Sequence, residues 1–320
     1  MNSLSKIEVG VLLKLREGKT ITELANELSL SIYRTSTLVA SLKRKGLVKT
    51  EKRGKYKITS LRETKPAELF RKLASRFGHM PLDSILSGKN LPLLAVLRDT
   101  PLSAHELCIK GNLPRSTLYY VLNRLSNYGI IGERDGRYFL VERYRLFHEF
   151  AREFYELQNS IKAREFSGDA VVVWSGVGEF ILSTRKYRGK DVRNFHLTGL
   201  ERFGDFGVEL IGTGRYHYYY SEKAEELSLE EVILHALLID FSPRTILYSI
   251  VLLLAYKRIN QKKLFNLGRK YGVSVGELLE YLKGREVRKY PYPPMEEVRE
   301  IFKMYFGEGD GCCNQRKDNI

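Results

Sequence analysis

Apolar residues recur at every third or fourth position in two stretches of the N-terminal half of the chain. The later stretch, residues 113–141, predicts a helix with one buried face and one polar face. Pro114 suits the first position of that helix, and Gly129 suits the residue that ends it. The buried face is predicted to consist of Leu118, Val121, Leu122 and Leu125.

A hairpin is predicted directly after this helix. Residues 130–133 and 137–140 are short strand candidates. The dipeptide Asp135-Gly136 between them is typical of a two-residue β-turn.

The earlier stretch has the same order of elements. Thr22 is expected to cap a short helix over residues 23–28, and a second helix is expected over residues 32–45, ending at Gly46. A basic hairpin over residues 47–58 follows. The buried positions of the second helix are predicted to be Ile32, Thr35, Leu38 or Val39, and Leu42.

The two stretches are predicted to be an internal repeat. A shift of 83 positions aligns Glu23-Leu24 with Glu106-Leu107, and the hairpins align one residue out of step, Gly54-Lys55-Tyr56 with Gly136-Arg137-Tyr138. Helices followed by a two-stranded wing are typical of the winged helix-turn-helix module, whose recognition helix enters the major groove of DNA. The sequence therefore predicts two such modules in tandem.

The remaining chain predicts a linker helix and a further domain. The apolar stripe of residues 143–164 suits packing on the next domain or on a second copy of the protein, so a homodimer is expected. Ser228 and Glu231 form a capping-box signature at the start of a helical group. Expected strands cover residues 170–174, 179–182, 208–211 and 216–220, and expected helices cover 228–239, 244–257, 261–271 and 275–283.

The predicted fold class is α+β. Its predicted domains are two winged helix-turn-helix domains (1–60 and 89–142), a connecting helix and loop (61–88), a linker helix (143–167), a C-terminal partner or effector domain with a small mixed β-sheet followed by a helical group (168–306), and a disordered tail (307–320).

Charge is concentrated in the N-terminal half. The chain carries a net charge of +15, and residues 1–60 hold 13 Lys and Arg against 5 Asp and Glu. A Lys/Glu-rich surface of the kind found in heat-adapted proteins would enrich both signs together. The local excess of one sign therefore favours a polyanionic partner, and we expect double-stranded DNA.

Candidate DNA contacts lie on the polar faces of the two recognition helices and on the two wings. Arginine can bond bidentately to guanine, hydroxyls can meet bases or phosphate, and wing cations can neutralise phosphate. The alternative is a protein-interaction surface, which suits the paired tyrosines of the second module best. The candidates are Tyr33, Arg34, Ser36, Thr37, Lys43, Arg44, Lys52, Arg53 and Lys55 in the first module, and Arg115, Ser116, Thr117, Tyr119, Tyr120, Asn123, Arg134 and Arg137 in the second.

Signals for catalysis, cofactors or metals are weak, and we expect none of the three. The segment 174–179 has glycines but lacks the spacing of a nucleotide-binding loop. His196, His217 and His235 are scattered and suit core or surface positions. Cys108, Cys312 and Cys313 give neither a disulfide framework nor a metal-ligand spacing, so a reducing, cytoplasmic setting is expected. Residues 246–255 are too short to cross a membrane and predict a buried helix.

The segment GTGRYHYYYSEK followed by LSLEEVILHALLIDFSPRTILYSIVLLLA resembles archaeal transcriptional regulators of the AbiEi-like antitoxin group. The resemblance is loose over most of the chain and most specific in residues 208–255. It implies an antitoxin that represses its own operon and is paired with a nucleotidyltransferase-type toxin. This chain departs from the simplest layout of the group because it has two predicted winged helices.

The predicted function is a sequence-specific, DNA-binding transcriptional regulator that acts by occupying an operator. One alternative is a ligand-responsive regulator whose C-terminal domain binds a small molecule. Another is a nucleic-acid-processing factor that uses the winged helices as DNA anchors. The last alternative would need a cluster of acidic or His/Cys residues that the sequence does not show.

Overall fold

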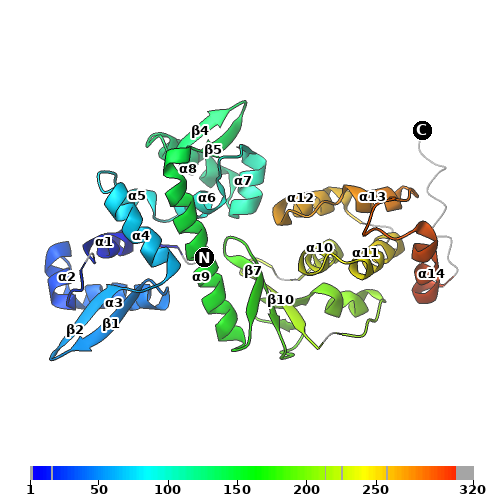
Figure 1. Cartoon of the computed structure of the whole chain (residues 1–320), viewed down its shortest axis with the longest axis horizontal. Helices are drawn as coiled ribbons and strands as arrows, with labels where there is room; N and C mark the ends of the chain where they lie inside the picture. The colour runs from blue at the N-terminus through cyan, green and yellow to red at the C-terminus, as the bar shows by residue number, and fades with distance from the viewer. Residues whose placement is uncertain (1–2, 16, 213, 225, 257–258, 308–320) are drawn as a thin grey trace. The chain divides into compact units, whose positions relative to one another are not determined.

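The chain divides into an N-terminal unit, residues 1–162 and 175–178, and a C-terminal unit, residues 163–174 and 179–320. A computed structural model describes residues 3–15, 17–212, 214–224, 226–256 and 259–307 (Figure 1). Helices and small antiparallel sheets occur together, so the fold class is α+β as predicted. Except for Gly307, the predicted tail, with Cys312 and Cys313, lies outside the described residues.

The N-terminal unit begins with what we call the first module, three helices and a hairpin. Ser5 starts α1 through a capping box with Glu8, and Thr20 starts α2 in the same way with Glu23. The predicted cap Thr22 is therefore wrong, because Glu23 bonds back to Thr20. The elements are α1 (Lys6–Lys14), α2 (Ile21–Leu28), α3 (Ile32–Arg44), β1 (Val48–Arg53) and β2 (Tyr56–Leu61).

The second module repeats this order. The elements are α6 (Asn90–Val96), β3 (Leu102–Ser103), α7 (Ala104–Gly111), α8 (Arg115–Ser126), β4 (Ile131–Arg134) and β5 (Arg137–Leu140). Pro114 is the N-cap of α8 and not its first helical residue, since its ψ of 149° is still extended. The four predicted core residues of α8 are all buried.

The internal repeat is confirmed by the positions of the helices. α7 and α8 begin 83 positions after α2 and α3. The left-handed residue after the shorter helix is Ser29 in one module and Asn112 in the other, with φ of 53° and 52°. The bridge between Lys19 and Thr59 corresponds to the pairing of Leu102 with Tyr138.

The two hairpins differ in length, which corrects the predicted alignment of their tips. The β1–β2 hairpin has six residue pairs and turns at Gly54-Lys55, whereas β4–β5 has four and turns at Asp135-Gly136. Both Asp135 and Gly136 have positive φ, as a type I′ turn requires. Gly54 therefore corresponds to Asp135 and not to Gly136.

The long helix α9 (Arg145–Phe166) packs against both modules. Its Gln158 amide donates to the Lys45 carbonyl of the first module (2.8 Å), and His148 Nδ1 bonds the Leu94 carbonyl of the second (3.0 Å). Phe147, Phe150 and Phe154 are fully buried in one apolar core that includes residues of both modules and of the connecting helices α4 (Lys65–Arg76) and α5 (Leu82–Ile85). The predicted apolar stripe is thus covered by the chain's own modules, and it gives no argument for a second copy.

The C-terminal unit contains a five-stranded sheet of order β6-β7-β10-β9-β8. The pairs β7–β10, β9–β10 and β8–β9 are antiparallel, and none of them supports the predicted mixed sheet. Strand residues alternate between two apolar cores, Phe180 and Tyr218 in one, Ile181 and Tyr219 in the other. The strands are β6 (Val171–Ser175), β7 (Glu179–Thr184), β8 (Asp191–Val192), β9 (Phe195–Thr198) and β10 (Tyr216–Ser221).

Helices follow this sheet. α10, α11, α12 and α13 match the four predicted helices closely, and Ser228 caps α10 through Glu231 as expected. The predicted strand over residues 208–211 is wrong, because the segment forms no strand although Val208 is fully buried. The elements are η2 (Gly199–Phe206), α10 (Leu229–Ile239), α11 (Pro243–Ala255), α12 (Gln261–Tyr271), α13 (Gly276–Leu282) and α14 (Met295–Phe306).

An ion pair inside the first module holds α1 against the end of α3. Lys45 Nζ lies 2.7 Å from Glu8 Oε1, and Ser41 also donates to this carboxylate. Burial alone would raise the pKa of Glu8, but hydrogen bonds from Lys45, the Ser5 amide and Ser41 outweigh burial, so that its pKa is lowered.

We expect Glu8→Gln to lower the free energy of unfolding at neutral pH by about 1–3 kcal/mol, because the half-buried Lys45 loses its carboxylate partner. A lowered carboxyl pKa stabilises the fold above the unfolded value of about 4.3, and this stabilisation is lost as pH falls through the folded pKa. The difference between wild type and variant should therefore shrink in acid, as measured by denaturant unfolding at a series of pH values. Glu63→Gln, which breaks an exposed pair with Lys49, is the control and should change little. A difference that is constant with pH would contradict the role of Glu8.

Gly46 ends α3 with a φ of +72°, and a Cβ built there would lie 3.1 Å from Leu157 of α9. Gly54 has a similar φ of +60° but open space around it. Both substitutions to Ala carry a backbone strain of about 1–2 kcal/mol. We expect Gly46→Ala to lower the free energy of unfolding by more than Gly54→Ala, since only Gly46 touches α9. Equal losses in denaturant unfolding would show that α9 does not pack there.

Candidate nucleic-acid interface

The residues that α3 buries determine which of its side chains face solvent. Thr35, Val39 and Leu42 are buried at helical spacing, which turns the predicted contact residues of this helix to solvent. Ile32 was predicted to be buried but is 59% exposed, because it occupies the first position of the helix, outside the core. The exposed predicted residues on α3 are Tyr33, Arg34, Ser36, Thr37, Lys43 and Arg44.

Two details define what this face can offer. The Thr37 hydroxyl already donates to the Tyr33 carbonyl (3.0 Å), so its oxygen remains available mainly as an acceptor. Tyr33 is 83% exposed, and Arg34 forms no ion pair within the described part of the chain. An unpaired arginine beside an exposed aromatic ring is suited to a base edge or to a phosphate.

The equivalent face of α8 is also exposed. Its predicted contact residues Arg115, Ser116, Tyr119, Tyr120 and Asn123 are exposed, and Thr117 is half-buried. The Arg115 guanidinium lies 5.8 Å from the centre of the Tyr119 ring, a cation–π contact that fixes its direction. Among the predicted contact residues, this face therefore carries one arginine, positioned on Tyr119, whereas α3 carries three cations.

The first hairpin places like charges opposite each other. Lys52 on β1 pairs directly with Lys57 on β2, one step from the turn that holds Lys55. Both lysines are exposed and neither forms an ion pair among the described residues. Arg53, at the next position, has Glu51 at 3.8 Å. Lys57 was missed from the sequence, because only the register of the hairpin shows that it faces Lys52.

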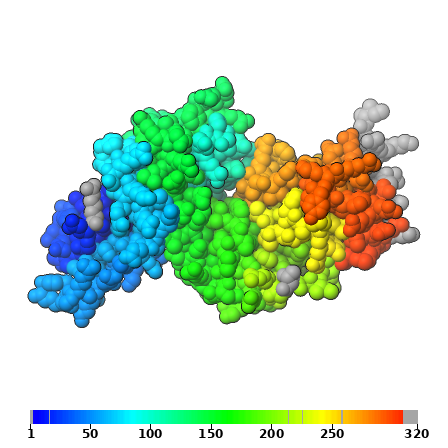
Figure 2. Space-filling view, in the orientation of Figure 1, coloured from blue at the N-terminus to red at the C-terminus, as the bar shows by residue number. Residues whose placement is uncertain are grey.

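The second hairpin has the same feature. Arg134 pairs directly with Arg137 beside the Asp135-Gly136 turn. Arg134 also lies over the Phe139 ring, 6.0 Å from its centre. Directly opposed like charges destabilise a strand pair, so an anion between them would relieve the repulsion. Figure 2 shows both hairpins projecting from the surface of the N-terminal unit.

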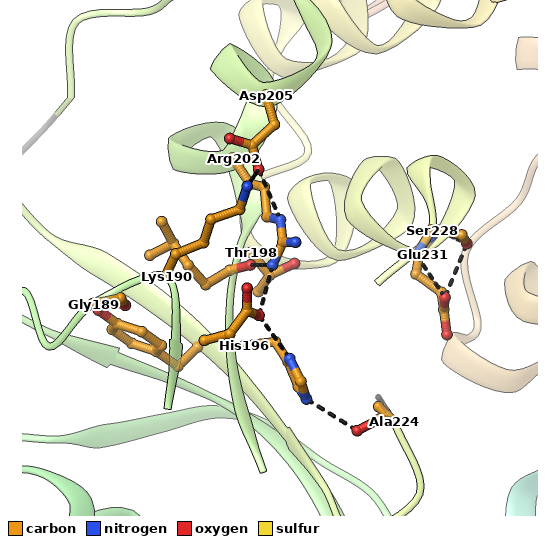
Figure 3. A network of polar contacts seen from close by, with 12 residues as sticks. Gly189, Lys190, His196, Thr198, Arg202, Asp205, Ala224, Ser228 and Glu231 are labelled. Carbon is orange, nitrogen blue, oxygen red and sulfur yellow. Dashed lines mark hydrogen bonds and ion pairs between the residues drawn. The ribbon is translucent and has the colours of Figure 1, made fainter. Parts of the chain in front are cut away.

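The C-terminal unit holds two polar networks. In one, Arg202 Nη1 donates to Asp191, which also bonds His196 Nδ1 at 2.7 Å, and His196 Nε2 faces the Ala224 carbonyl (Figure 3). Burial would raise the pKa of Asp191, but these partners outweigh it and lower that pKa. The network ties the β8–β9 turn to η2 and to the segment after β10.

The second network is buried among β7, β9, β10, α10 and α12. His235 is fully buried between the Thr198 hydroxyl (2.8 Å) and the Tyr271 hydroxyl (2.9 Å), and burial lowers its pKa to about 3. Tyr219 donates to Glu179, which also accepts from Lys270 at 2.6 Å. His196 and His235 are thus core histidines, as predicted, with their hydrogen bonds satisfied.

The described residues were also compared with the requirements of a metal site and of a membrane span. No cluster of three or more His, Cys, Asp or Glu side chains in that part of the chain could hold a metal ion. Among the helices described, none has the length and apolarity needed to cross a membrane.

Comparison with known proteins gives one match. A protein-family model described as HVO_2833_C, C-terminal, matches residues 192–305, which is less than half of the chain. No curated protein and no solved structure matched the chain. The matched region includes both polar networks except Glu179 and Asp191. It also includes residues 208–255, and its description does not mention the AbiEi-like group, so that resemblance stays a prediction.

Proposed function

We propose that the N-terminal unit is a pair of tandem winged helix-turn-helix modules that bind double-stranded DNA, and that the protein is a transcriptional regulator acting by operator occupancy. In each module three residues separate the shorter helix from the exposed one, α2 from α3 and α7 from α8. Such a short turn is typical of helix-turn-helix motifs. In this proposal α3 and α8 are the recognition helices, and the two hairpins are the wings.

The observation that carries the proposal is the pair of opposed cations at each wing, Lys52 with Lys57 and Arg134 with Arg137. A surface that only needed solubility would alternate charges, because opposed unlike charges stabilise a hairpin. Two wings of different length and turn type carry the same unfavourable pairing. A phosphate backbone along the wing would supply the missing anions.

The two modules are proposed to contribute differently. The first has more unpaired cations on its helix and wing and would supply most of the affinity. The second has exposed Tyr119 and Tyr120, which suit either a sugar–phosphate edge or a protein surface.

The C-terminal unit is proposed to act as a partner domain. The resemblance to AbiEi-like antitoxins suggests repression of the protein's own operon, a nucleotidyltransferase-type toxin as partner and a homodimeric cytoplasmic regulator. Co-purification of the tagged full chain with such a toxin would support this part, and a protein that binds DNA but no toxin would remove it while leaving the DNA-binding proposal intact.

We expect the double variant Lys52→Ala/Lys57→Ala to bind every duplex more weakly and to lower the slope of log affinity against log salt by about two between roughly 50 and 200 mM salt. Its thermal stability should be unchanged or higher, because the cross-strand repulsion is removed. Fluorescence anisotropy with a random-sequence duplex measures the first effect, and a melting curve measures the second.

The control is Lys262→Ala/Arg299→Ala, which removes two exposed cations of the C-terminal unit. It should leave the salt slope unchanged if binding is local to the wings. Equal losses in both double variants would indicate nonspecific attraction by net charge and would contradict the wing assignment.

Arg34→Ala should relax sequence preference at one or two positions, by about 1–3 kcal/mol for a bidentate contact to guanine. Selection of bound duplexes from a random library, done with wild type and variant, measures this effect. The wing variant should select the wild-type sequence with lower affinity. An unchanged selected sequence for Arg34→Ala would exclude α3 as a recognition helix.

A further inference from the structure

A cleft of about 560 Å³ lies within the N-terminal unit; its lining includes no residue of α3, α8 or the β1–β2 hairpin, and it reaches the second hairpin only at its base, Leu140. Its walls come from α4, from the segment after α6, from the end of β5 and from the first half of α9. Leu69 and Leu140 supply apolar surface, and His148, which is 8% exposed, lies in the lining. This volume falls in the range of small-molecule sites.

The cations of the cleft are not all matched by anions. Arg145 is paired with Glu149, and Arg152 with Glu156, along α9. Lys65, Lys72 and Arg98 come from two different walls and form no ion pair within the described residues. Three uncommitted cations that converge on one concavity are suited to an anionic ligand.

We propose that this cleft binds a small organic anion, one with a phosphate or carboxylate group held by Lys65, Lys72 and Arg98 and a less polar body against Leu69 and Leu140. DNA is a poorer occupant, because the lining also includes the carboxylates of Asp99, Glu142, Glu149 and Glu153, which disfavour a continuous chain of phosphates more than a single anionic group placed at the three cations. The alternative of a ligand-responsive regulator, in which the C-terminal domain would bind the small molecule, thus becomes a proposal that the N-terminal unit binds it.

The walls of the cleft belong to elements that fix the two modules. α4 follows the hairpin of the first module, and the Arg98 carbonyl accepts from the Leu140 amide at the base of the second hairpin (2.8 Å). α9 contacts both modules. A ligand that contacts both Lys72 and Arg98 therefore links α4 to the second module. If the ligand binds one arrangement of the two modules more tightly than another, its binding would change the affinity of the protein for DNA. This last step rests on the proposed DNA-binding function, whereas ligand binding itself does not.

The test is isothermal titration of the full chain, without DNA, with a panel of small anions at up to millimolar concentration: pyrophosphate, citrate, 3-phosphoglycerate, adenosine monophosphate and phenyl phosphate, with adenosine and phenol as uncharged counterparts. We expect at least one anion to bind and its uncharged counterpart not to bind. Lys72→Ala/Arg98→Ala should weaken that binding by about tenfold or more, since charge-assisted hydrogen bonds are lost.

The matched control is Arg71→Ala, which removes an exposed cation from the adjacent position of α4 but does not line the cleft. Its affinity for the anion should stay close to that of wild type. Absence of binding by every anion of the panel, or equal weakening in the control, would overturn the proposal.

Binding of duplex DNA by the same variants is the last measurement. If Lys72→Ala/Arg98→Ala weakens DNA binding and no small anion binds, the cleft belongs to the DNA path and the proposal is wrong. If the anion binds as expected while the wild-type chain binds no duplex, the cleft stands and the proposed DNA function fails.

Discussion

The aromatic face of α9 is the constraint on which the N-terminal unit depends. Phe147, Phe150 and Phe154 are fully buried in a core to which both modules contribute. The ring centre of Phe70 in α4 lies 5.8 Å from that of Phe150. The ring centre of Phe77 lies 5.0 Å from that of Phe147. Burial of such side chains stabilises a fold by several kcal/mol in total. The modules are therefore not independent domains joined by a flexible linker. Both modules pack on the same helix, so α9 sets their spacing.

Polar contacts complete this arrangement at the two ends of the aromatic row. His148 bonds a carbonyl of the second module, and Gln158 bonds the carbonyl at the end of α3. Each buried carbonyl would otherwise lack a partner at a helix end. These two bonds thus hold α9 against the end of α3 in the first module and against α6 in the second.

Local signals in the sequence predicted the local structure well. The cap Ser228, the Asp135-Gly136 turn, the buried face of α8 and the helices of the C-terminal unit follow from short spacings. Thr20 was missed although its capping box with Glu23 is also a short spacing, because Thr22 lies nearer the apolar run. These features depend on neighbours within one or two turns of the chain.

Features that depend on distant partners were not predictable in this way. β9 escaped detection because its polar residues His196 and Thr198 are buried by bonds to Asp191 and His235, and no pattern in the strand reveals those partners. Residues 208–211 have strand-forming composition but no strand to pair with. Lys57 became a candidate only through the hairpin register, and the cleft brings together residues from 65 to 153.

The unequal hairpins have a consequence for symmetry. The β1–β2 hairpin is two residue pairs longer than β4–β5, which extends it by roughly 7 Å at about 3.3 Å per residue. Many dimeric repressors recognise palindromes because their two halves are identical. Here two related but unequal modules belong to one chain and are held by one core, so the chain has an intrinsic direction. A nucleic acid bound across both would be recognised with a defined polarity, and its sequence would not need to be its own inverted complement.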